Sequence, residues 1–336
     1  MAERRSFAAI DIFKFFMAGF VLLIHTNPLL DISVAAEWFL RSGITVIAVP
    51  FFFIATGYFV LSNDQATKKS LRKLSMLYIV WSVIYLPFAL IQLKGENAIA
   101  LQYVRRFFLW GSYDTIWYLL ASVVGLALVY ALKKWKGITF AFAVMLAFHV
   151  LAIIGTSYTG AIANTFLWKG YAVYFDMFTT FKNGLFFGGI YIALGGLIHE
   201  KFSEIAHFTK KRGKFIILIA CLFGAMWIET IACEFFDLNR YGVDMKFMLV
   251  PLSACIFVYV LTLQLNISDK TSIFFRKMST LIFLTQRLFL TGYELLGIQK
   301  YCHSFVWFVV VSASTILFSW GLIALSERCH LLKKIY

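Results

Sequence analysis

Long runs of apolar residues, separated by short polar segments, repeat along the whole 336-residue chain. A helix needs about 20 mostly apolar residues to cross the hydrocarbon core of a bilayer. Windows of that length predict ten membrane-spanning helices, near residues 7–27, 43–62, 75–93, 115–132, 138–155, 180–198, 215–233, 247–265, 279–297 and 305–325. The runs are apolar all round and lack the two-residue alternation of a barrel strand. The pattern therefore predicts an all-α integral membrane protein with a single domain, residues 1–336.

The composition fits a chain whose main solvent is lipid. Apolar residues make up 61% of it and charged residues only 14%, whereas soluble domains are about 45–50% apolar and about 25% charged. A soluble fold of this length could not cover so much apolar surface. We therefore expect a multi-pass protein of a cell membrane, with the lipid bilayer as its first partner.

The net charge of +14 first suggests a nucleic-acid partner, but the basic residues lie in short clusters between the apolar runs. If the N-terminus is cytoplasmic, most of the 31 lysines and arginines fall on the cytoplasmic side, in clusters within residues 4–5, 68–73, 133–136, 201–214, 270–277 and 328–334. Such a bias orients membrane proteins. It predicts two cytoplasmic termini and explains the charge without any nucleic acid.

The first apolar run follows two arginines and superficially resembles a signal peptide. It contains Lys14, ends in "IHTNP" rather than at a small-residue cleavage site, and is followed by many further runs, so we expect a retained helix. The five cysteines and the other histidines share no spacing typical of a metal site, and we predict none.

Within this first run, Lys14 and His25 are eleven residues apart. Eleven helical steps amount to three turns plus about 20°, so both side chains share one face, about 16 Å apart along the axis. Ionisable groups inside a membrane are energetically unfavourable unless paired or hydrated, which makes them functional candidates. The alternatives are structural: Lys14 extends to the interface or pairs with Asp11, and His25 ends the helix before Pro28.

Glu229 in the seventh predicted span and Arg287 in the ninth are opposite charges in lipid, and we expect them either to pair or to bind substrate. Residues 94–114 and 156–181 are long, aromatic-rich segments predicted to lie outside the membrane. They fit amphipathic interfacial helices or the cover of a cavity, although an interfacial aromatic belt is the simpler explanation.

Several motifs resemble those of acyltransferase family 3, the multi-pass membrane acyltransferases of bacteria. Lys14 and His25, with ten residues between them, resemble the first-helix signature of the family. "AVPFFFIATGYF" resembles the Pro–aromatic–small–Gly segment of its second helix, and "KKSLRKLSMLY" resembles the basic pair that opens the third, here Arg72 and Lys73. "IWYL" resembles the start of the fourth helix, with Trp117.

Within the family, the chain is similar to the membrane half of serine racemases from vancomycin-resistance operons. The similar stretches include "IHTNPL", "WYLLAS" and "NGLFFGGIYIALGG". The chain ends shortly after its last predicted span, so we expect no counterpart of the racemase half in it.

The resemblance implies an acyltransferase of the bacterial plasma membrane that uses acyl-CoA, with acetyl-CoA expected, as co-substrate and no bound cofactor. The acceptor would be a hydroxyl group, such as that of a cell-envelope carbohydrate. His25 would be the general base. The candidate substrate-binding residues are Lys14, Arg72 and Lys73 for the CoA phosphates, and Asn27, Trp117, Glu229 and Arg287.

One departure weakens a mechanism with two histidines: Gln286 stands where many family members carry a late histidine, and an amide cannot accept a proton at useful pH. Thr26 or Asn27 could orient the His25 ring or donate to an oxyanion. A different class of function is a transport domain for serine, like the membrane half of the racemases, because Pro50 and paired glycines allow broken helices. An inactive membrane scaffold is a third reading.

Overall fold

The computed structural model describes residues 7–209, 211–242, 244–329, 332 and 335–336, and these residues form helices, turns and loops with no β-strand. The prediction of an all-α fold is therefore confirmed for the described part of the chain. Five of the basic residues that set the predicted orientation lie outside the described residues: Arg4, Arg5, Lys210, Lys333 and Lys334.

The packing divides the chain into two compact units, although the sequence predicted one domain. Unit 1 comprises Met1–Phe52 and Val258–Tyr336, and unit 2 comprises Phe53–Phe257. The divisions fall inside two helices, α3 (Ala48–Val60) and α13 (Leu249–Thr262). Each unit is described by itself below, and the single domain stays a prediction.

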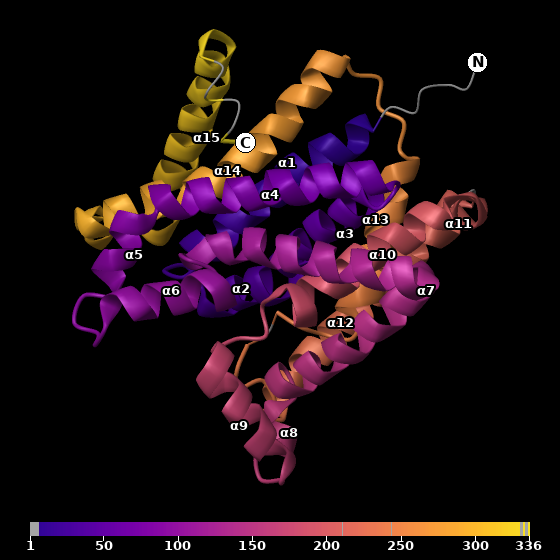
Figure 1. Cartoon of the computed structure of the whole chain (residues 1–336), viewed down its shortest axis with the longest axis horizontal. Helices are drawn as coiled ribbons and strands as arrows, with labels where there is room; N and C mark the ends of the chain where they lie inside the picture. Colours follow the sequence, from indigo (N-terminus) through magenta and orange to yellow (C-terminus); the bar gives the residue numbers. More distant parts are fainter. Residues whose placement is uncertain (1–6, 210, 243, 330–331, 333–334) are drawn as a thin grey trace. The chain divides into compact units, whose positions relative to one another are not determined.

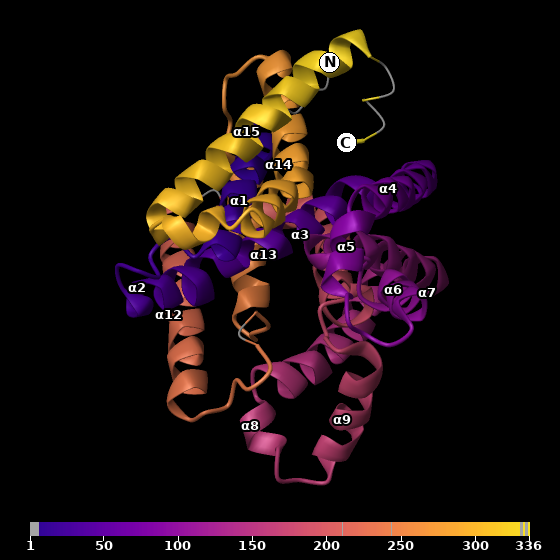
Figure 2. The ribbon, with the colours of Figure 1, turned by 90° about the vertical axis from the view of Figure 1, so that its left-hand side faces the viewer.

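Unit 1 is built on three helices, α1 (Ala8–Thr26), α14 (Asp269–Leu295) and α15 (Ser304–Arg328), which pack side by side (Figure 2). Its other elements are short: α2 (Val34–Phe39), the π-helix η1 (Leu40–Ile44) and the 3₁₀-helices η2 (Thr45–Ile47) and η5 (Ile298–Tyr301). The core between the three long helices includes Ala18, Leu22, Leu281, Leu290 and Trp307. Small Ala18, which is fully buried, lets α1 approach α14 closely.

Unit 2 contains residues 53–60 of α3 and residues 249–257 of α13, together with all the remaining helices (Figure 1). They are α4 (Asp64–Ile84), α5 (Leu86–Gln92), α6 (Ile99–Leu109), η3 (Asp114–Ile116), α7 (Trp117–Thr156), α8 (Thr159–Ile162), α9 (Leu167–Phe178), η4 (Gly184–Gly188), α10 (Gly189–Glu200), α11 (Phe202–Thr209) and α12 (Arg212–Phe235). The packing centre of unit 2 is α7, which contacts α10, the π-helix η4 and α4.

Glycines let α3 and α10 pack backbone against backbone in unit 2. A Cβ atom on Gly57 would lie 1.9 Å from the carbonyl oxygen of Ile192, and one on Gly195 would lie 2.1 Å from that of Ile54. Both helices are apolar, so the close approach gains van der Waals contact that larger residues would block. This approach explains Gly195, one of the paired glycines, without the broken helix that the transport hypothesis allowed there.

Among the residues that the structure describes, five helices are long and apolar enough to cross a membrane: Ala8–Thr26, Val34–Val60, Asp114–Thr156, Arg212–Phe235 and Ser304–Arg328. A sixth span results if α4 and α5, which meet at an angle of 59°, are taken together. A multi-pass membrane protein is therefore supported, whereas ten spans are not confirmed. Two apolar helices, Gly184–Glu200 and Leu249–Thr262, are shorter than a full span, and α14 is too polar to qualify.

The predicted fourth and fifth spans are joined in the segment Asp114–Thr156. A straight helix of that length would measure about 64 Å, twice the hydrocarbon thickness. The helix breaks at Lys136 and Gly137, where the backbone leaves the helical region and Gly137 has φ 85° and ψ 171°. This break lies where the sequence placed the loop between the two spans.

Candidate functional site

His25 lies in the last turn of α1, in unit 1, and the local sequence explains why the helix ends there. Asn27 takes the left-handed conformation, with φ 48°, and its N–H donates to the carbonyl of Leu23 at 3.2 Å. Pro28 follows and cannot continue the helix. The hydroxyl of Thr26 donates to the carbonyl of Leu22 at 2.8 Å and is buried, so it is not directed at the ring of His25.

The turn after His25 is attached to α15 by hydrogen bonds. The N–H of Ser304 donates to Asp31 Oδ2 at 2.6 Å, and the Ser304 hydroxyl donates to the carbonyl of Pro28 at 2.9 Å. On the other side, the N–H of Leu29 donates to buried Glu37 at 2.8 Å. These bonds hold the chain just beyond His25 in one conformation, so the imidazole is presented from a fixed backbone.

Arg287 of α14 contacts the imidazole directly: its Nη2 lies 3.3 Å from His25 Nδ1. A guanidinium has only donors, so Nδ1 must be the acceptor. The neutral ring therefore carries its proton on Nε2, and Nδ1 holds the lone pair that a base would use. Of the candidate residues, the structure brings His25 and Arg287 together.

A second polar cluster lies near the other end of α1. Asp11, which is 6% exposed, accepts a hydrogen bond from the Ser272 hydroxyl at 2.7 Å, and Arg276 Nε lies 4.0 Å from the same carboxylate oxygen. Lys14 interacts electrostatically with both Asp11 and Arg276. Lys14 thus belongs to a cluster of charges that joins α1 to α14, as the alternative pairing with Asp11 anticipated.

Sequence reasoning missed Ser272 and Arg276, because Arg276 was counted as a loop charge. A signal was present: Arg276 and Arg287 are eleven residues apart, like Lys14 and His25. Both pairs share a helix face, and α1 and α14 run parallel, since Asp11 meets Ser272 and His25 meets Arg287. The equal spacings therefore place two polar clusters along the interface between α1 and α14. One contains Asp11 and Arg276, and the other contains His25 and Arg287.

The expected phosphate-binding residues of α4 lie in unit 2. Arg72 lines an open hollow of about 550 Å³ together with Asp64, Gln65, Lys68 and Lys69, whereas Lys73 is not among the lining residues. Asp64, Lys68 and Arg72 are four residues apart and share one helix face. Three cations and one carboxylate give the hollow a net positive charge, which suits a phosphate group.

Glu229 of α12 also lies in unit 2, and its carboxylate binds the chain segment that leads into α13. It accepts hydrogen bonds from the Tyr158 hydroxyl at 3.1 Å and from the N–H groups of Phe247 and Met248 at 2.8 and 2.9 Å. Burial and the charge of Glu229 raise the pKa of Tyr158 well above its usual range. Because Arg287 belongs to unit 1, the expected pairing of Glu229 with Arg287 stays a prediction.

Lys246, which lies between the predicted spans near 215–233 and 247–265, is only 2% exposed. Burial lowers the pKa of Lys246 to about 8, although the charges of Asp244 and Glu229 act in the opposite direction. Asp244 also pairs with Lys182. Unit 2 therefore holds one buried lysine beside partly exposed carboxylates, which no motif in the sequence indicated.

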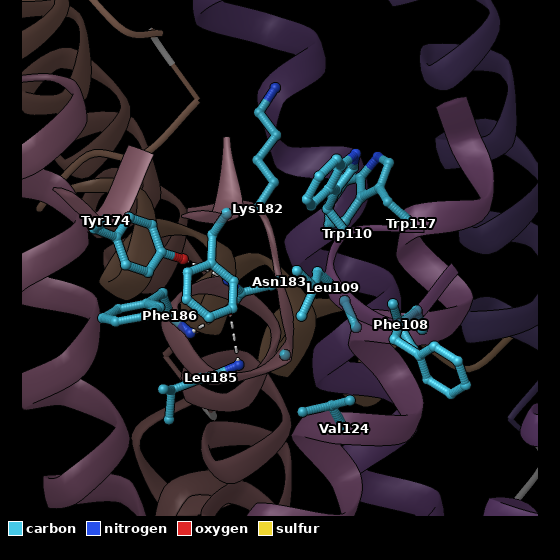
Figure 3. Close-up of a pocket in the computed structure, with 14 residues that line it drawn as sticks. Phe108, Leu109, Trp110, Trp117, Val124, Tyr174, Lys182, Asn183, Leu185 and Phe186 are labelled. Atoms are coloured by element: carbon cyan, nitrogen blue, oxygen red, sulfur yellow. Dashed lines mark hydrogen bonds between the residues drawn. The ribbon is translucent and has the colours of Figure 1, made fainter. Parts of the chain in front are cut away.

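Trp117 lines a cavity of about 400 Å³ in unit 2. Figure 3 shows Trp110 and Trp117 on one side and Tyr174 and Phe186 on the other. Residues of α6 and α9, the two aromatic-rich segments, contribute to this lining, so both segments border a cavity, and the interfacial aromatic belt stays a prediction. The helices are linked because Arg105 donates to the carbonyls of residues 176 and 177, at 2.5 and 2.7 Å.

Gln286, next to Arg287 on α14, is fully buried, and its amide donates to the carbonyl of Phe283 at 3.2 Å. Within the part of the chain that the structure describes, no group of three or more His, Cys, Asp or Glu side chains is placed to hold a metal ion.

Comparisons with known proteins identify the family of this chain and several relatives. The family model described as an acyltransferase domain matches residues 7–324. Two amino-acid racemases of Enterococcus faecalis are 28% and 27% identical to the chain over 264 and 277 residues, and a serine/alanine racemase of Enterococcus gallinarum is 25% identical over 252 residues. The alignments cover 76%, 78% and 72% of this chain but only 36%, 38% and 35% of these relatives, so the chain spans little more than a third of their length. No solved structure matches.

Proposed function

The chain belongs to acyltransferase family 3, and on this premise we propose that it transfers an acyl group from acyl-CoA to a hydroxyl acceptor. The family match over residues 7–324 and the long apolar helices support a membrane acyltransferase in general. The finer proposal is that the donor is acetyl-CoA, that the acceptor is a cell-envelope carbohydrate, and that the enzyme works in a bacterial plasma membrane.

His25 is the proposed general base, and its contact with Arg287 is the observation that carries the proposal. The acceptor hydroxyl would replace the guanidinium at Nδ1 and give its proton to that nitrogen as its oxygen attacks the thioester carbonyl. The CoA thiolate then leaves, and the proton on the imidazole can neutralise it.

Displaced from Nδ1, Arg287 would stand close to the reacting carbonyl. A guanidinium there stabilises the negative charge that develops on the carbonyl oxygen, the role of an oxyanion hole. The amide of Asn27 is a second candidate donor, since it follows the same helix end.

The donor's phosphates need cations. In unit 2, the hollow lined by Arg72, Lys68 and Lys69 supports binding of CoA phosphates there, with Lys73 adjacent in sequence. In unit 1, Lys14 is a separate candidate for the same chemistry, in a cluster where Asp11 already faces Arg276.

The test is transfer or slow hydrolysis of radiolabelled acetyl-CoA by purified protein in liposomes. We expect His25→Ala to lower the rate by about 10²–10⁴-fold, the usual contribution of a general base. His207→Ala, an exposed histidine of unit 2, is the matched control and should keep the wild-type rate. An unchanged rate in His25→Ala, or no turnover in the wild type, would reject the proposal.

A second candidate function is amino-acid transport, with serine as the first substrate to test. Two observations favour it: the relatives carry the names amino-acid racemase and serine/alanine racemase, and non-α turns interrupt apolar helices. These turns are the π-helices η1 and η4 and the bend of 59° between α4 and α5; broken helices are typical of transport sites. Serine uptake into proteoliposomes without acetyl-CoA would support transport, and its absence alongside acetyl transfer would reject it.

A further inference from the structure

The cavity of about 400 Å³ in unit 2 is lined mostly by apolar side chains (Figure 3). Its volume falls in the usual range of small-molecule sites, about 300–1,000 Å³. The lining residues of α7 are spaced i, i+3, i+4 and i+7 and so share one helix face: Trp117, Leu120, Ala121 and Val124. At about 1.5 Å per residue, this face extends about 10 Å from Trp117 to Val124. The cavity therefore follows α7 for about two turns.

A π-helix forms another wall of the cavity, and a glycine brings it close to α7. A Cβ atom on Gly184 of η4 would lie 2.4 Å from the backbone nitrogen of Gly125 and 2.7 Å from the Cβ atom of Val124. A larger residue could not approach α7 in this way. Single π-turns inside helices are frequently found at functional sites. The two walls are therefore held together by backbone contact.

Two polar side chains of the lining already have hydrogen-bond partners. The Tyr174 hydroxyl donates to the carbonyl of Thr180 at 3.1 Å and accepts from the Asn183 amide at 2.8 Å. The amide oxygen of Asn183 accepts from the N–H groups of Leu185 and Phe186, at 3.1 and 3.0 Å. A polar ligand would lose its hydration in this cavity and gain few hydrogen bonds in return, which is unfavourable. The lining therefore favours an apolar occupant.

Two of the apolar lining residues are exposed, so the cavity reaches the surface of unit 2. Phe108 of α6 is 68% exposed, and Val124 of α7 is 37% exposed. The segment that contains α7 is long and apolar enough to cross a membrane, so its exposed apolar side chains face lipid. Leu101 and Val104 are also exposed and lie on the same side of α6 as Phe108. A hydrocarbon chain can therefore enter the cavity from the bilayer without crossing water.

Lys182 is the charged residue of this lining. Figure 3 shows its ammonium toward the same end of the cavity as the indole nitrogens of Trp110 and Trp117, whereas Val124 lies toward the other end. Lys182 pairs with Asp244, which is not a lining residue. An ammonium has three donors, so it can hold Asp244 and a further anion together. One end of the cavity thus presents a cation and two indole donors, which suits a phosphate group.

We propose that this cavity binds one acyl chain of a phospholipid from the surrounding bilayer, with the lipid phosphate at Lys182. The chain lies along the α7 face between Trp117 and Val124, and the second chain stays in the bilayer beside exposed Phe108. Tryptophan rings are typical of the headgroup level of a membrane, where the phosphate belongs. A phospholipid is favoured over a free fatty acid because the exposed surface of α6 and α7 borders the bilayer itself.

This site goes beyond the proposed acyl transfer and does not depend on it. It lies in unit 2, whereas His25 lies in unit 1. Binding of lipid is therefore measured apart from both acyl transfer and serine uptake.

The experiment measures lipid binding to the full chain by native mass spectrometry, in a detergent whose rigid, steroid-like tail imitates an acyl chain poorly. Dioleoyl phosphatidylglycerol and dioleoylglycerol are the probes, because they differ only in the phosphate-bearing headgroup. We expect phosphatidylglycerol to bind at least about tenfold more tightly, since charge-assisted hydrogen bonds to Lys182 are available only to the phosphate. Lys182→Met should remove this difference, whereas Lys169→Met, at an exposed position of α9, should keep it.

Leu120→Trp and Val124→Trp test the cavity itself. A larger ring takes the space of the chain, so each variant should bind phosphatidylglycerol about tenfold more weakly or worse, because less of the chain is buried. Val83→Trp is the matched control, since Val83 of α4 is 64% exposed and is not among the lining residues. It should bind as the wild type does. Thermal unfolding in the same detergent checks that all variants are folded.

Three outcomes would overturn the proposal. The first is equal binding of the two probes by the wild type, or binding of neither. The second is phosphatidylglycerol binding that persists in both cavity variants, because the lipid would then lie elsewhere on the surface. The third uses oleate: oleate that binds more tightly than phosphatidylglycerol, and is lost in the cavity variants, would assign the cavity to a free fatty acid.

Discussion

Arg287 and His25 meet where α14 packs on α1, and the donor–acceptor geometry at this contact sets the protonation pattern of the imidazole. The sequence predicted that His25 belongs to the functional face of the first helix and gave Arg287 a role in substrate binding. It did not predict that the two touch. Their contact joins residues 262 positions apart in the chain, which no local pattern can reveal.

Arg287→Gln should lower kcat for acetyl transfer by about 10²-fold and leave KM for acetyl-CoA nearly unchanged. The reason is that the guanidinium acts on charge that develops only in the transition state. Steady-state kinetics in liposomes measures both constants. Arg240→Gln is the control, because Arg240 forms an exposed pair with Asp237 at 2.9 Å. A change in KM alone would assign Arg287 to ground-state binding.

Lys246 predicts a pH dependence of stability. Its pKa is lowered from 10.5 to about 8 in the folded protein, so above pH 8 the unfolded state binds more protons than the folded state. The unfolding free energy should therefore rise with pH between about 8 and 10.5, as the buried charge is relieved.

The measurement is denaturant unfolding in detergent at pH 7.5 and 9.5, with Lys246→Met beside the wild type. We expect the gain in stability from pH 7.5 to 9.5 to shrink in the variant. Lys300→Met, in η5 at an exposed position, should keep the wild-type gain. Equal gains in all three proteins would contradict the assignment to Lys246.

At the scale of elements, the sequence predicted correctly where α1 ends and where α7 is interrupted. It did not predict the lengths of the membrane spans correctly. Asn27 and Pro28 end α1 where the sequence placed its end, and Gly137 interrupts α7 between two predicted spans. α14 was predicted as a span near 279–297 but extends over Asp269–Leu295 and is comparatively polar. Its polar residues contact α1, and a hydropathy window has no access to such contacts.

Gly57→Ala should destabilise the protein by about 2 kcal/mol or more, because the added Cβ would overlap a backbone carbonyl that cannot move aside. Thermal unfolding in detergent measures the effect. Gly224→Ala is the control: this helical glycine of α12 has open space around its Cβ position, so alanine there should be neutral or stabilising. Similar unfolding temperatures for the two variants would show that α3 and α10 do not pack as described.

At the scale of the whole molecule, membrane character follows directly from composition, and the family match agrees with it. Topology is less determined. In the described part of the chain, five helices, or six with the bent pair, are long and apolar enough to span a membrane, against ten predicted. The orientation rests on the distribution of basic residues, and it stays a prediction.

Labelling with a membrane-impermeant maleimide tests that orientation in a variant without native cysteines. Glu96→Cys and Lys136→Cys place single thiols at exposed loop positions that the ten-span topology puts on opposite sides. We expect the thiol at position 96 to react in intact cells, and the one at position 136 only after permeabilisation. The reverse pattern would invert the topology, and equal reaction of both would reject a crossing between them.

The sequence by itself determined the all-α membrane class, the shared face of Lys14 and His25, the family and the end of the first helix. Each of these depends on composition or on residues within a few helical turns of one another. The periodicity of apolar residues, the helix-capping residues and the spacing of motif residues are all local properties of the sequence. Only the tertiary structure decided that Arg287 occupies Nδ1 of His25, that Arg276 faces Asp11, and that Lys246 is buried. Such features depend on which helix packs against which, and a hydrogen bond between residues 261 or 262 positions apart leaves no periodic signal in the chain.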